Sequence, residues 1–263
     1  MTRIEKRFAQ LKSEGRKAFI PYITAGDPTL EQTGQLVLAL DKAGADLIEL
    51  GVPFSDPIAD GPVIQRATER GLKAGVTLSK VLDLGTKIRQ KSEVPLVLFS
   101  YYNPLLNHGL EKLAKDAAAA GFDGVLASDL TVEESGAFVR AMHTAGLDTI
   151  FLVAPTSSPQ RMKKIAEAST GFLYAVSRTG VTGEQQRLAV DLKDFLRALR
   201  RCTQSPIAVG FGISRPEHVK AVWEEADGAI VGSSIVKEVE QHIGKPDMVE
   251  KVAAFAAWLK GAQ

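Results

Sequence analysis

The chain alternates short apolar runs with segments of helical spacing, and this alternation limits the possible folds more than any other feature. Eight apolar runs are spread along it: Ala18–Thr24, Asp46–Gly51, Leu96–Tyr101, Gly124–Ala127, Thr149–Ala154, Leu173–Val176, Ile207–Gly210 and Ala229–Val231. Most of these runs lack the polar–apolar alternation of a half-exposed strand. We therefore expect strands that are covered on both faces, as in a parallel sheet flanked by helices.

The number of predicted strands favours a closed barrel. Eight strands alternating with helices over 263 residues match the strand count and length of a (β/α)₈ TIM barrel. The alternative is a doubly wound sheet, which in its dinucleotide-binding form carries a G-x-G-x-x-G turn after the first strand. The first predicted strand here runs into Thr24–Pro28, which lacks that turn. No low-complexity linker divides the chain, so we predict one barrel domain over residues 1–263.

Two further segments predict helices. Met1–Gly15 places Ile4, Phe8 and Leu11 on one side, and we expect this extra N-terminal helix to cover the barrel floor. The stretch Thr131–Glu134 has the pattern of a capping box, which predicts that a helix begins there.

Composition excludes several classes of protein. The formal net charge of +1 argues against a nucleic-acid-binding protein, and Cys202 is the only cysteine, which excludes an internal disulfide. No apolar stretch reaches the roughly 18–20 residues of a membrane span, and the charged N-terminal segment has no signal-peptide core. We expect a cytoplasmic protein. The four histidines have no ligand spacing, so no metal site is predicted.

Carboxylates gather where the second predicted strand ends, which is the end at which barrels place their active sites. Glu49 closes the apolar run, and a loop with three prolines follows that carries Asp56 and Asp60. Proline limits backbone freedom, so this loop predicts carboxylates held in fixed positions for proton transfer. The structural alternatives are a buried ion pair for Glu49 and a turn residue for Asp60, since Asp-Gly is a common turn signal.

Glycine-rich turns after the last two strands predict a phosphate site. The turns are Gly210–Ser214, which includes Phe211 and Gly212, and Gly232–Ser234, with a helix expected to begin at Ser233. Free backbone N–H groups and the positive end of a helix suit an anion. The loop Arg178–Arg187, which contains Thr182, is either a surface connection or a lid over the ligand.

Aromatic side chains near the same strand ends predict an apolar pocket. Phe99, Tyr101, Tyr174 and Phe211 are its candidates, although Phe99 is equally suited to filling the core. No lysine lies at a strand end, which disfavours an aldolase that works through a Schiff base.

These segments resemble the tryptophan synthase α subunit family over nearly the full length of the chain. The resemblance rests on PYITAGDP (Pro21–Pro28), ELGVPFSDPIADGP (Glu49–Pro62), SRTGVTG (Ser177–Gly183), GFGIS (Gly210–Ser214) and GSSIVK (Gly232–Lys237). It implies a TIM barrel that cleaves indole-3-glycerol phosphate to indole and glyceraldehyde 3-phosphate without a cofactor of its own. It also implies a β subunit that holds pyridoxal phosphate and receives the indole within an αββα complex.

The resemblance also implies roles for individual residues. Glu49 corresponds to the catalytic acid–base, and Asp60 to the carboxylate near the indole nitrogen. The residues implied to contact the substrate are Tyr22, Phe99, Tyr101 and Tyr174 around indole, and Gly183, Phe211, Gly212, Gly232 and Ser233 around phosphate. If the loop Arg178–Arg187 is a lid, we also expect Thr182 to meet the second carboxylate and so to contact the substrate. Those implied to face the β subunit are Asp56, Asn103 and the stretch near Asp129.

The chain departs from the family pattern at two positions. Thr131 stands where proline is usual, in the region expected to contact the β subunit, and Tyr22 stands where phenylalanine is frequent. The Tyr22 hydroxyl then needs a hydrogen-bond partner. Three other functions stay open: a lyase that works without a partner, a barrel that isomerises a sugar phosphate, and a non-catalytic barrel that only activates a partner.

Overall fold

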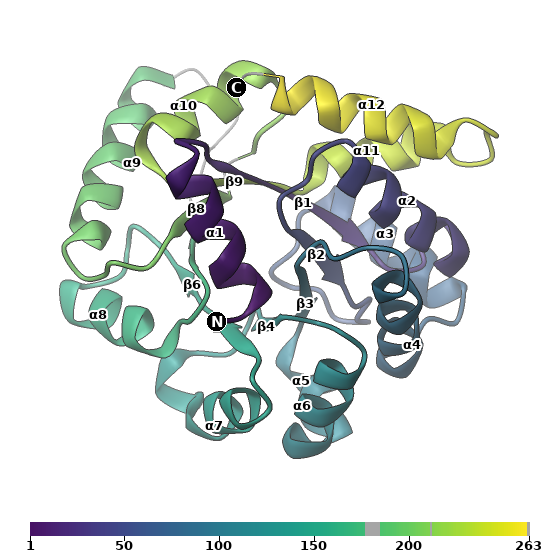
Figure 1. The fold of residues 1–263 in the computed structure, drawn as a ribbon, viewed down its shortest axis with the longest axis horizontal. Coiled ribbons are helices and arrows are strands. Elements are labelled where there is room, and N and C mark those ends of the chain that lie inside the picture. Colours follow the sequence, from purple (N-terminus) through teal and green to yellow (C-terminus); the bar gives the residue numbers. More distant parts are fainter. Residues whose placement is uncertain (177–184, 211, 262–263) are drawn as a thin grey trace.

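Parallel strands form a nearly closed barrel in the computed structural model, which describes residues 1–176, 185–210 and 212–261 (Figure 1). The strands are β1 (Ala18–Thr24), β2 (Ile48–Gly51), β3 (Leu96–Ser100), β4 (Gly124–Ala127), β5 (Asp148–Ile150), β6 (Leu152–Val153), β7 (Leu173–Val176), β8 (Ile207–Gly210) and β9 (Gly228–Val231). Strand β1 pairs in parallel with both β2 and β9, so the first and last strands meet. The two ends of the strand order are β5 and β6, which only Phe151 separates in the chain, so the sheet curves back on itself. This arrangement confirms the predicted barrel, because the two edges of an open doubly wound sheet lie far apart.

The fifth predicted strand is divided in two. Strand β5 pairs with β4, β6 pairs with β7, and Phe151 separates them. The buried Phe151 ring meets Phe138 edge-on at 6.2 Å, outside the barrel. Of the other seven predicted strands, four have the observed bounds and three differ by one or two residues at one end.

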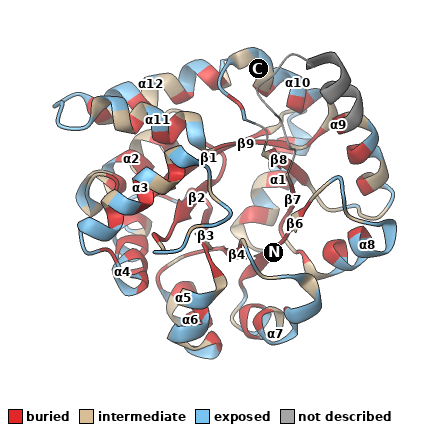
Figure 2. Cartoon of the chain, turned by 180° about the vertical axis from the view of Figure 1, so that it is seen from behind, coloured by how far each residue is buried: buried red, intermediate tan, exposed pale blue. Residues whose placement is uncertain are grey.

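Helices surround the strands and turn their buried faces toward them (Figure 2). They are α1 (Arg3–Ser13), α2 (Leu30–Lys42), α3 (Pro62–Lys73), α4 (Leu78–Arg89), α5 (Tyr102–His108), α6 (Leu110–Ala119), α7 (Gly136–Thr144), α8 (Pro159–Ala168), α9 (Gln185–Arg200), α10 (Pro216–Glu225), α11 (Ser233–His242) and α12 (Met248–Lys260). None of the helices in the described ranges is both long and apolar enough to cross a bilayer.

The capping box predicted at Thr131 is wrong. Val132–Glu134 forms a single 3₁₀ turn, no side-chain cap is present at Thr131, and helix α7 begins only at Gly136. A capping box needs the N-cap hydroxyl to reach the N–H three residues later in an α-helical turn, and the tighter 3₁₀ turn does not provide that geometry.

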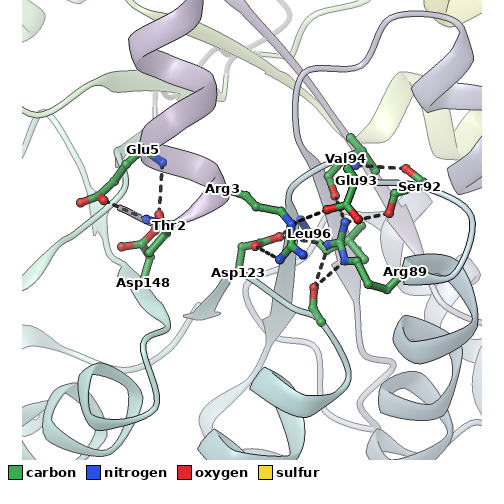
Figure 3. A network of polar contacts seen from close by, with 11 residues as sticks. Thr2, Arg3, Glu5, Arg89, Ser92, Glu93, Val94, Leu96, Asp123 and Asp148 are labelled. Atoms are coloured by element: carbon green, nitrogen blue, oxygen red, sulfur yellow. Dashed lines mark hydrogen bonds and ion pairs between the residues drawn. The ribbon is translucent and has the colours of Figure 1, made fainter.

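Helix α1 covers the floor of the barrel, as predicted, and lies across its opening in Figure 1. Ile4, Phe8 and Leu11 are buried against inward-facing residues of the strands. Polar contacts hold the same helix in place: Thr2 donates to Asp148 (2.6 Å) and Arg3 pairs with Asp123 (3.0 Å), as Figure 3 shows. The floor is therefore closed by packing and charge together, which leaves the opposite end of the barrel for a site.

The strand register decides which side chains reach that opposite end. Tyr22 of β1 lies beside Glu49 of β2, and Glu49 lies beside Val97 of β3. Neighbouring residues in a parallel sheet point to the same face, so these three side chains all point into the barrel. Val97 belongs to the interior apolar cluster. Tyr22 lies toward the carboxyl end of β1, and Glu49, the second residue of β2, lies beside it inside the barrel.

Candidate active site

A cavity of about 450 Å³ opens at the carboxyl ends of the strands. Seven of the predicted site residues line it: Tyr22, Asp60, Phe99, Tyr174, Gly212, Gly232 and Ser233. They come from loops and strands at positions far apart in the chain. The structure therefore brings together both the expected aromatic residues and the expected phosphate loops.

A larger cavity, about 870 Å³, lies at the other end of the barrel between α1 and the start of the strands. Most of its charged lining is already paired, since Arg7 bonds Asp46 at 2.5 Å and Arg3 bridges Glu93 and Asp123. Because these charges are satisfied within the protein and barrels carry their chemistry at the opposite face, the smaller cavity is the candidate site.

Glu49, the second residue of β2, is fully buried inside the barrel. Neither carboxylate oxygen has a hydrogen-bond partner among the described residues, and no ion pair offsets the burial. Burial therefore raises the pKa of Glu49 to about 8. The buried ion pair considered as the alternative is absent from the described part of the chain, and at neutral pH this carboxyl is mainly a neutral acid.

Glu49 lies within electrostatic reach of the cavity wall. Its charge contributes to raising the pKa of Tyr22 and of Tyr174, although burial is the main cause for both hydroxyls. Both tyrosines line the cavity, and Asp60 acts on them in the same direction. Asp60 therefore lines the cavity itself, whereas Glu49 does not line it and lies next to Tyr22 of its wall.

Asp60 is half-buried at the rim, two residues before helix α3 begins at Pro62. Burial raises its pKa, and a hydrogen bond from the Tyr101 hydroxyl acts in the opposite direction. That hydroxyl also accepts the backbone N–H of Ala59 at 2.9 Å, so Tyr101 holds the loop that carries Asp60. Tyr101 does not line the cavity itself, and its contact is with the loop rather than with the cavity space.

Aromatic rings form the wall of the cavity. Tyr22 and Phe99 meet edge-to-face with ring centres 5.2 Å apart, an arrangement that suits a flat aromatic ligand beside them. The Tyr22 hydroxyl has Thr24 as its partner at 3.4 Å and lies over Gly51, where a Cβ would come within 2.2 Å of its oxygen. Gly210 makes the same kind of room for Tyr174, with 2.6 Å to its hydroxyl.

The end of the cavity predicted to hold phosphate is built from two turns and the start of one helix. Helix α11 begins at Ser233 after Gly232, and no side chain caps its free N–H groups. The Ser234 hydroxyl donates to the Ile213 carbonyl, which joins this turn to the turn after β8. Lys237, one turn into α11, also lines the cavity and adds a positive charge. These features together suit an anion.

Some predicted residues cannot be placed and some lining residues were not predicted. Thr182, Gly183 and Phe211 lie outside the described residues. Lys237 and Ser128 were missed, and the Ser128 hydroxyl is buried at the cavity without a partner in the described ranges. A serine after a strand carries no sequence signal of its own, whereas Lys237 follows the glycine turn by one helical turn and was detectable from that spacing.

Comparison with known proteins places the chain in a family. A family model described as "Tryptophan synthase alpha chain" matches residues 8–262. The chain belongs to the tryptophan synthase α chain family. The α chain of Solibacter usitatus is 55% identical over 260 residues, covering 99% of this chain and 97% of that protein. The α chain of Geobacter sulfurreducens is 48% identical over 262 residues, covering 100% and 99%.

Solved structures agree with that assignment. The α subunit from Legionella pneumophila str. Paris superposes with a TM-score of 0.92 at 37% identity, covering 100% of this chain and 98% of that one. A chain of the tryptophan synthase complex from Pyrococcus furiosus gives 0.85 at 38% identity, covering 93% and 98%. The chain is thus a lyase of tryptophan biosynthesis that cleaves indole-3-glycerol phosphate to indole and glyceraldehyde 3-phosphate.

Proposed function

We propose that Glu49 and Asp60 are the acid–base pair of this cleavage. The observation that carries the proposal is the buried carboxyl of Glu49, which has no partner in the described ranges and has a pKa of about 8 beside a cavity that Asp60 lines. A neutral carboxylic acid at pH 7 can donate a proton that an ordinary surface glutamate has already lost.

The chemistry is a retro-aldol cleavage in which each proton transfer has a donor and an acceptor. Glu49 protonates C3 of the indole ring, which places positive charge on the ring nitrogen, and Asp60 stabilises that charge. The Glu49 carboxylate then takes the proton from the hydroxyl next to the C3 bond. The carbon–carbon bond breaks, its electrons return to the ring, and the hydroxyl carbon becomes the aldehyde of glyceraldehyde 3-phosphate. Well-positioned acid–base groups contribute about 10²–10⁴-fold each.

Substrate binding uses the remaining predicted residues. Tyr22, Phe99 and Tyr174 hold the indole ring, and the two glycine turns with Gly212, Gly232 and Ser233 hold the phosphate. Tyr101 acts on Asp60 through the loop it fastens. Phosphate binding far from the reacting carbon fixes geometry rather than taking part in the chemistry. Thr182, Gly183 and Phe211 are proposed from the family resemblance alone.

Conservative substitutions test the assignment. Glu49→Gln keeps the shape and removes the proton, so we expect kcat to fall by at least about 10²-fold with substrate affinity retained. Asp60→Asn is expected to lower kcat in the same way. Indole release from indole-3-glycerol phosphate measures both variants.

Matched controls come from exposed acids on outer helices. Glu111→Gln on α6 and Asp83→Asn on α4 make the same chemical change far from the cavity and are expected to leave kcat unchanged. Turnover of Glu49→Gln near the wild-type rate would remove Glu49 from the mechanism, and a rate for Asp60→Asn within a few-fold of wild type would remove Asp60.

We further propose a β subunit as partner, in an αββα complex in which the β subunit holds pyridoxal phosphate and receives the indole. Asp56, Asn103 and Asp129, the residues expected at that interface, are all exposed. Large apolar side chains are exposed in the same segments: Ile58 at 87% and Leu106 at 52%. Exposed apolar groups beside polar ones are typical of a protein interface.

A further inference from the structure

Four charged side chains link three segments around the cavity rim. Arg70 of α3 forms a fork on Asp27, with contacts of 2.6 and 3.0 Å, and its third nitrogen bonds Glu240 of α11 at 2.8 Å. Arg66, one turn earlier on α3, holds both oxygens of Glu240 at 2.7 Å. A planar guanidinium that bridges two carboxylates holds them in a geometry that a lysine cannot reproduce.

The linked segments are the ones that carry the site. Helix α3 begins at Pro62, two residues after Asp60, and helix α11 begins at Ser233 beside the predicted phosphate turn. Asp27 follows strand β1, which carries Tyr22. Arg70 therefore joins the segments of the proton-transfer residue, the anion end and the aromatic wall.

The two helices are also packed on the cavity side. Ile64 and Ala67 of α3 and Val236 of α11 form a small buried cluster with Tyr22. At Gly71, next to Arg70, the backbones touch: a Cβ there would lie 2.7 Å from the Ala25 carbonyl. Helix α3 is thus seated against the β1 loop, and apolar packing and the ion pairs hold it from two sides.

The charged side chains of this network differ in how deeply they are buried. The side chain of Asp27 is 2% exposed, and those of Arg70 and Glu240 are 23% and 25% exposed. Loss of Arg70 would leave the buried carboxylate of Asp27 without its partner. Loss of Glu240 would remove a partner from Arg70, whose side chain water still reaches. Helix α11 packs in addition against α12 and β1, while α3 packs mainly on β1 and α11. The position of helix α3 therefore depends more on Arg70 than the position of α11 does.

We propose that Arg70 is a positioning residue for the lyase reaction, which holds α3 against α11 and the β1 loop and thereby keeps Asp60 at its place over the substrate. This inference rests on the acid–base role proposed for Asp60. It predicts that losing Arg70 affects proton transfer more than phosphate binding, because α11 keeps its other contacts.

The experiment compares Arg70→Gln, Arg70→Lys and Asp60→Asn in the full chain. We expect Arg70→Gln to lower kcat at least about tenfold, since a small displacement of a catalytic group is costly, and to change the dissociation constant of inorganic phosphate less than about twofold. Arg70→Lys keeps the charge and loses the forked contact with Asp27, so we expect its kcat to lie between those of Arg70→Gln and the wild type.

Arg3 provides a matched control at the other end of the barrel. It also bridges a buried aspartate and an exposed glutamate, Asp123 and Glu93 (Figure 3). Arg3→Gln is expected to lower the melting temperature and to leave kcat unchanged in the folded protein. An equal loss of kcat in Arg3→Gln and Arg70→Gln would mean general destabilisation and would overturn the inference.

The outcomes separate this inference from the proposed function. If Asp60→Asn loses activity and folded Arg70→Gln keeps kcat within twofold, the inference is overturned and the role of Asp60 stands. If Asp60→Asn stays active, the role of Asp60 fails and the inference fails with it. If Arg70→Gln does not fold, Glu240→Gln decides, because it keeps the Arg70–Asp27 pair and removes only the link to α11. A kcat unchanged in Glu240→Gln overturns the inference, and a reduced kcat with unchanged phosphate affinity supports it.

Discussion

At the scale of single residues, Glu49 shows how burial creates a reagent. Tyr22 is its neighbour in the strand register, and the described residues offer its carboxyl neither a hydrogen bond nor a cation. A carboxyl taken out of water without a partner keeps its proton to a higher pH. The cost to stability is the reason why such groups are found mainly where function requires them.

Activity should therefore depend on pH through Glu49. Because the pKa of Glu49 is about 8 in the folded protein, the acid form is present at neutral pH and is lost as the pH rises through that value. We expect kcat/KM for indole release to fall about tenfold per pH unit above this pKa. A pH–rate profile of the isolated chain from pH 6 to 10 measures it.

The same group makes stability depend on pH. Its pKa in the folded protein lies above the unfolded value of 4.5, so the wild-type protein loses stability as the pH rises from about 4.5 to about 8. Glu49→Gln does not titrate, so its stability relative to wild type should increase over that window. Urea unfolding at pH 5 and pH 8 checks the sign, and an advantage that shrinks with rising pH contradicts the assignment.

At the scale of elements, helix α1 stabilises the barrel without taking part in the chemistry. Phe8 is buried and meets Phe172 with ring centres 5.8 Å apart, at the floor of the barrel. The cavity with Asp60 lies at the other end of the strands. The packing of α1 and the proposed catalytic site therefore lie at different ends of the same strands.

Shortening Phe8 should separate these two properties. Phe8→Ala is expected to lower the free energy of unfolding by about 3–5 kcal/mol, because it removes a buried ring and leaves a cavity. Below the unfolding transition kcat should stay within twofold of wild type. Denaturant unfolding and the indole assay measure the two effects, with Trp258→Ala, which truncates a ring 53% exposed on α12, as the milder control. A large loss of kcat in folded Phe8→Ala would show that the floor affects the site.

At the scale of the whole molecule, the barrel brings distant parts of the chain to one end. Tyr22, Asp60 and Ser233 are far apart in sequence and line one cavity. The segments proposed to meet the β subunit, which hold Ile58 and Leu106, lie in loops and a helix that follow β2 and β3. The proposed partner would thus contact the loop that carries Asp60.

A β subunit should therefore raise the rate of cleavage, and an exposed apolar residue should be needed for it. We expect Leu106→Asp on α5 to raise at least about tenfold the β-subunit concentration that gives half of the activation, because it places a charge in an apolar contact. Ile243→Asp, at the far end of α11, is the control with a comparable exposed side chain. Titration with a β subunit in the indole assay measures both. No rise in rate for the wild type would favour a lyase that works alone.

The parts of the site that follow from local pattern were predictable, and the parts that follow from packing were not. Glu49 stands at the end of an apolar run and Gly232 in a glycine turn, and both signals can be read over a few residues. Ser128 becomes a lining residue only through the barrel's curvature. Arg70, Asp27 and Glu240 look like ordinary surface charges in the sequence, because their contact needs three segments to meet.

The order of strands and helices, the extra helix on the floor and the polar strand ends were determined by the sequence itself, since apolar periodicity and turn residues act over short distances. Only the tertiary structure decided that Phe151 interrupts the fifth strand, that Thr131 opens a 3₁₀ turn, and that Glu49 is buried without a partner in the described ranges. Burial and pairing depend on which residues meet across the barrel, and that is set by the packing of the closed chain rather than by any one segment.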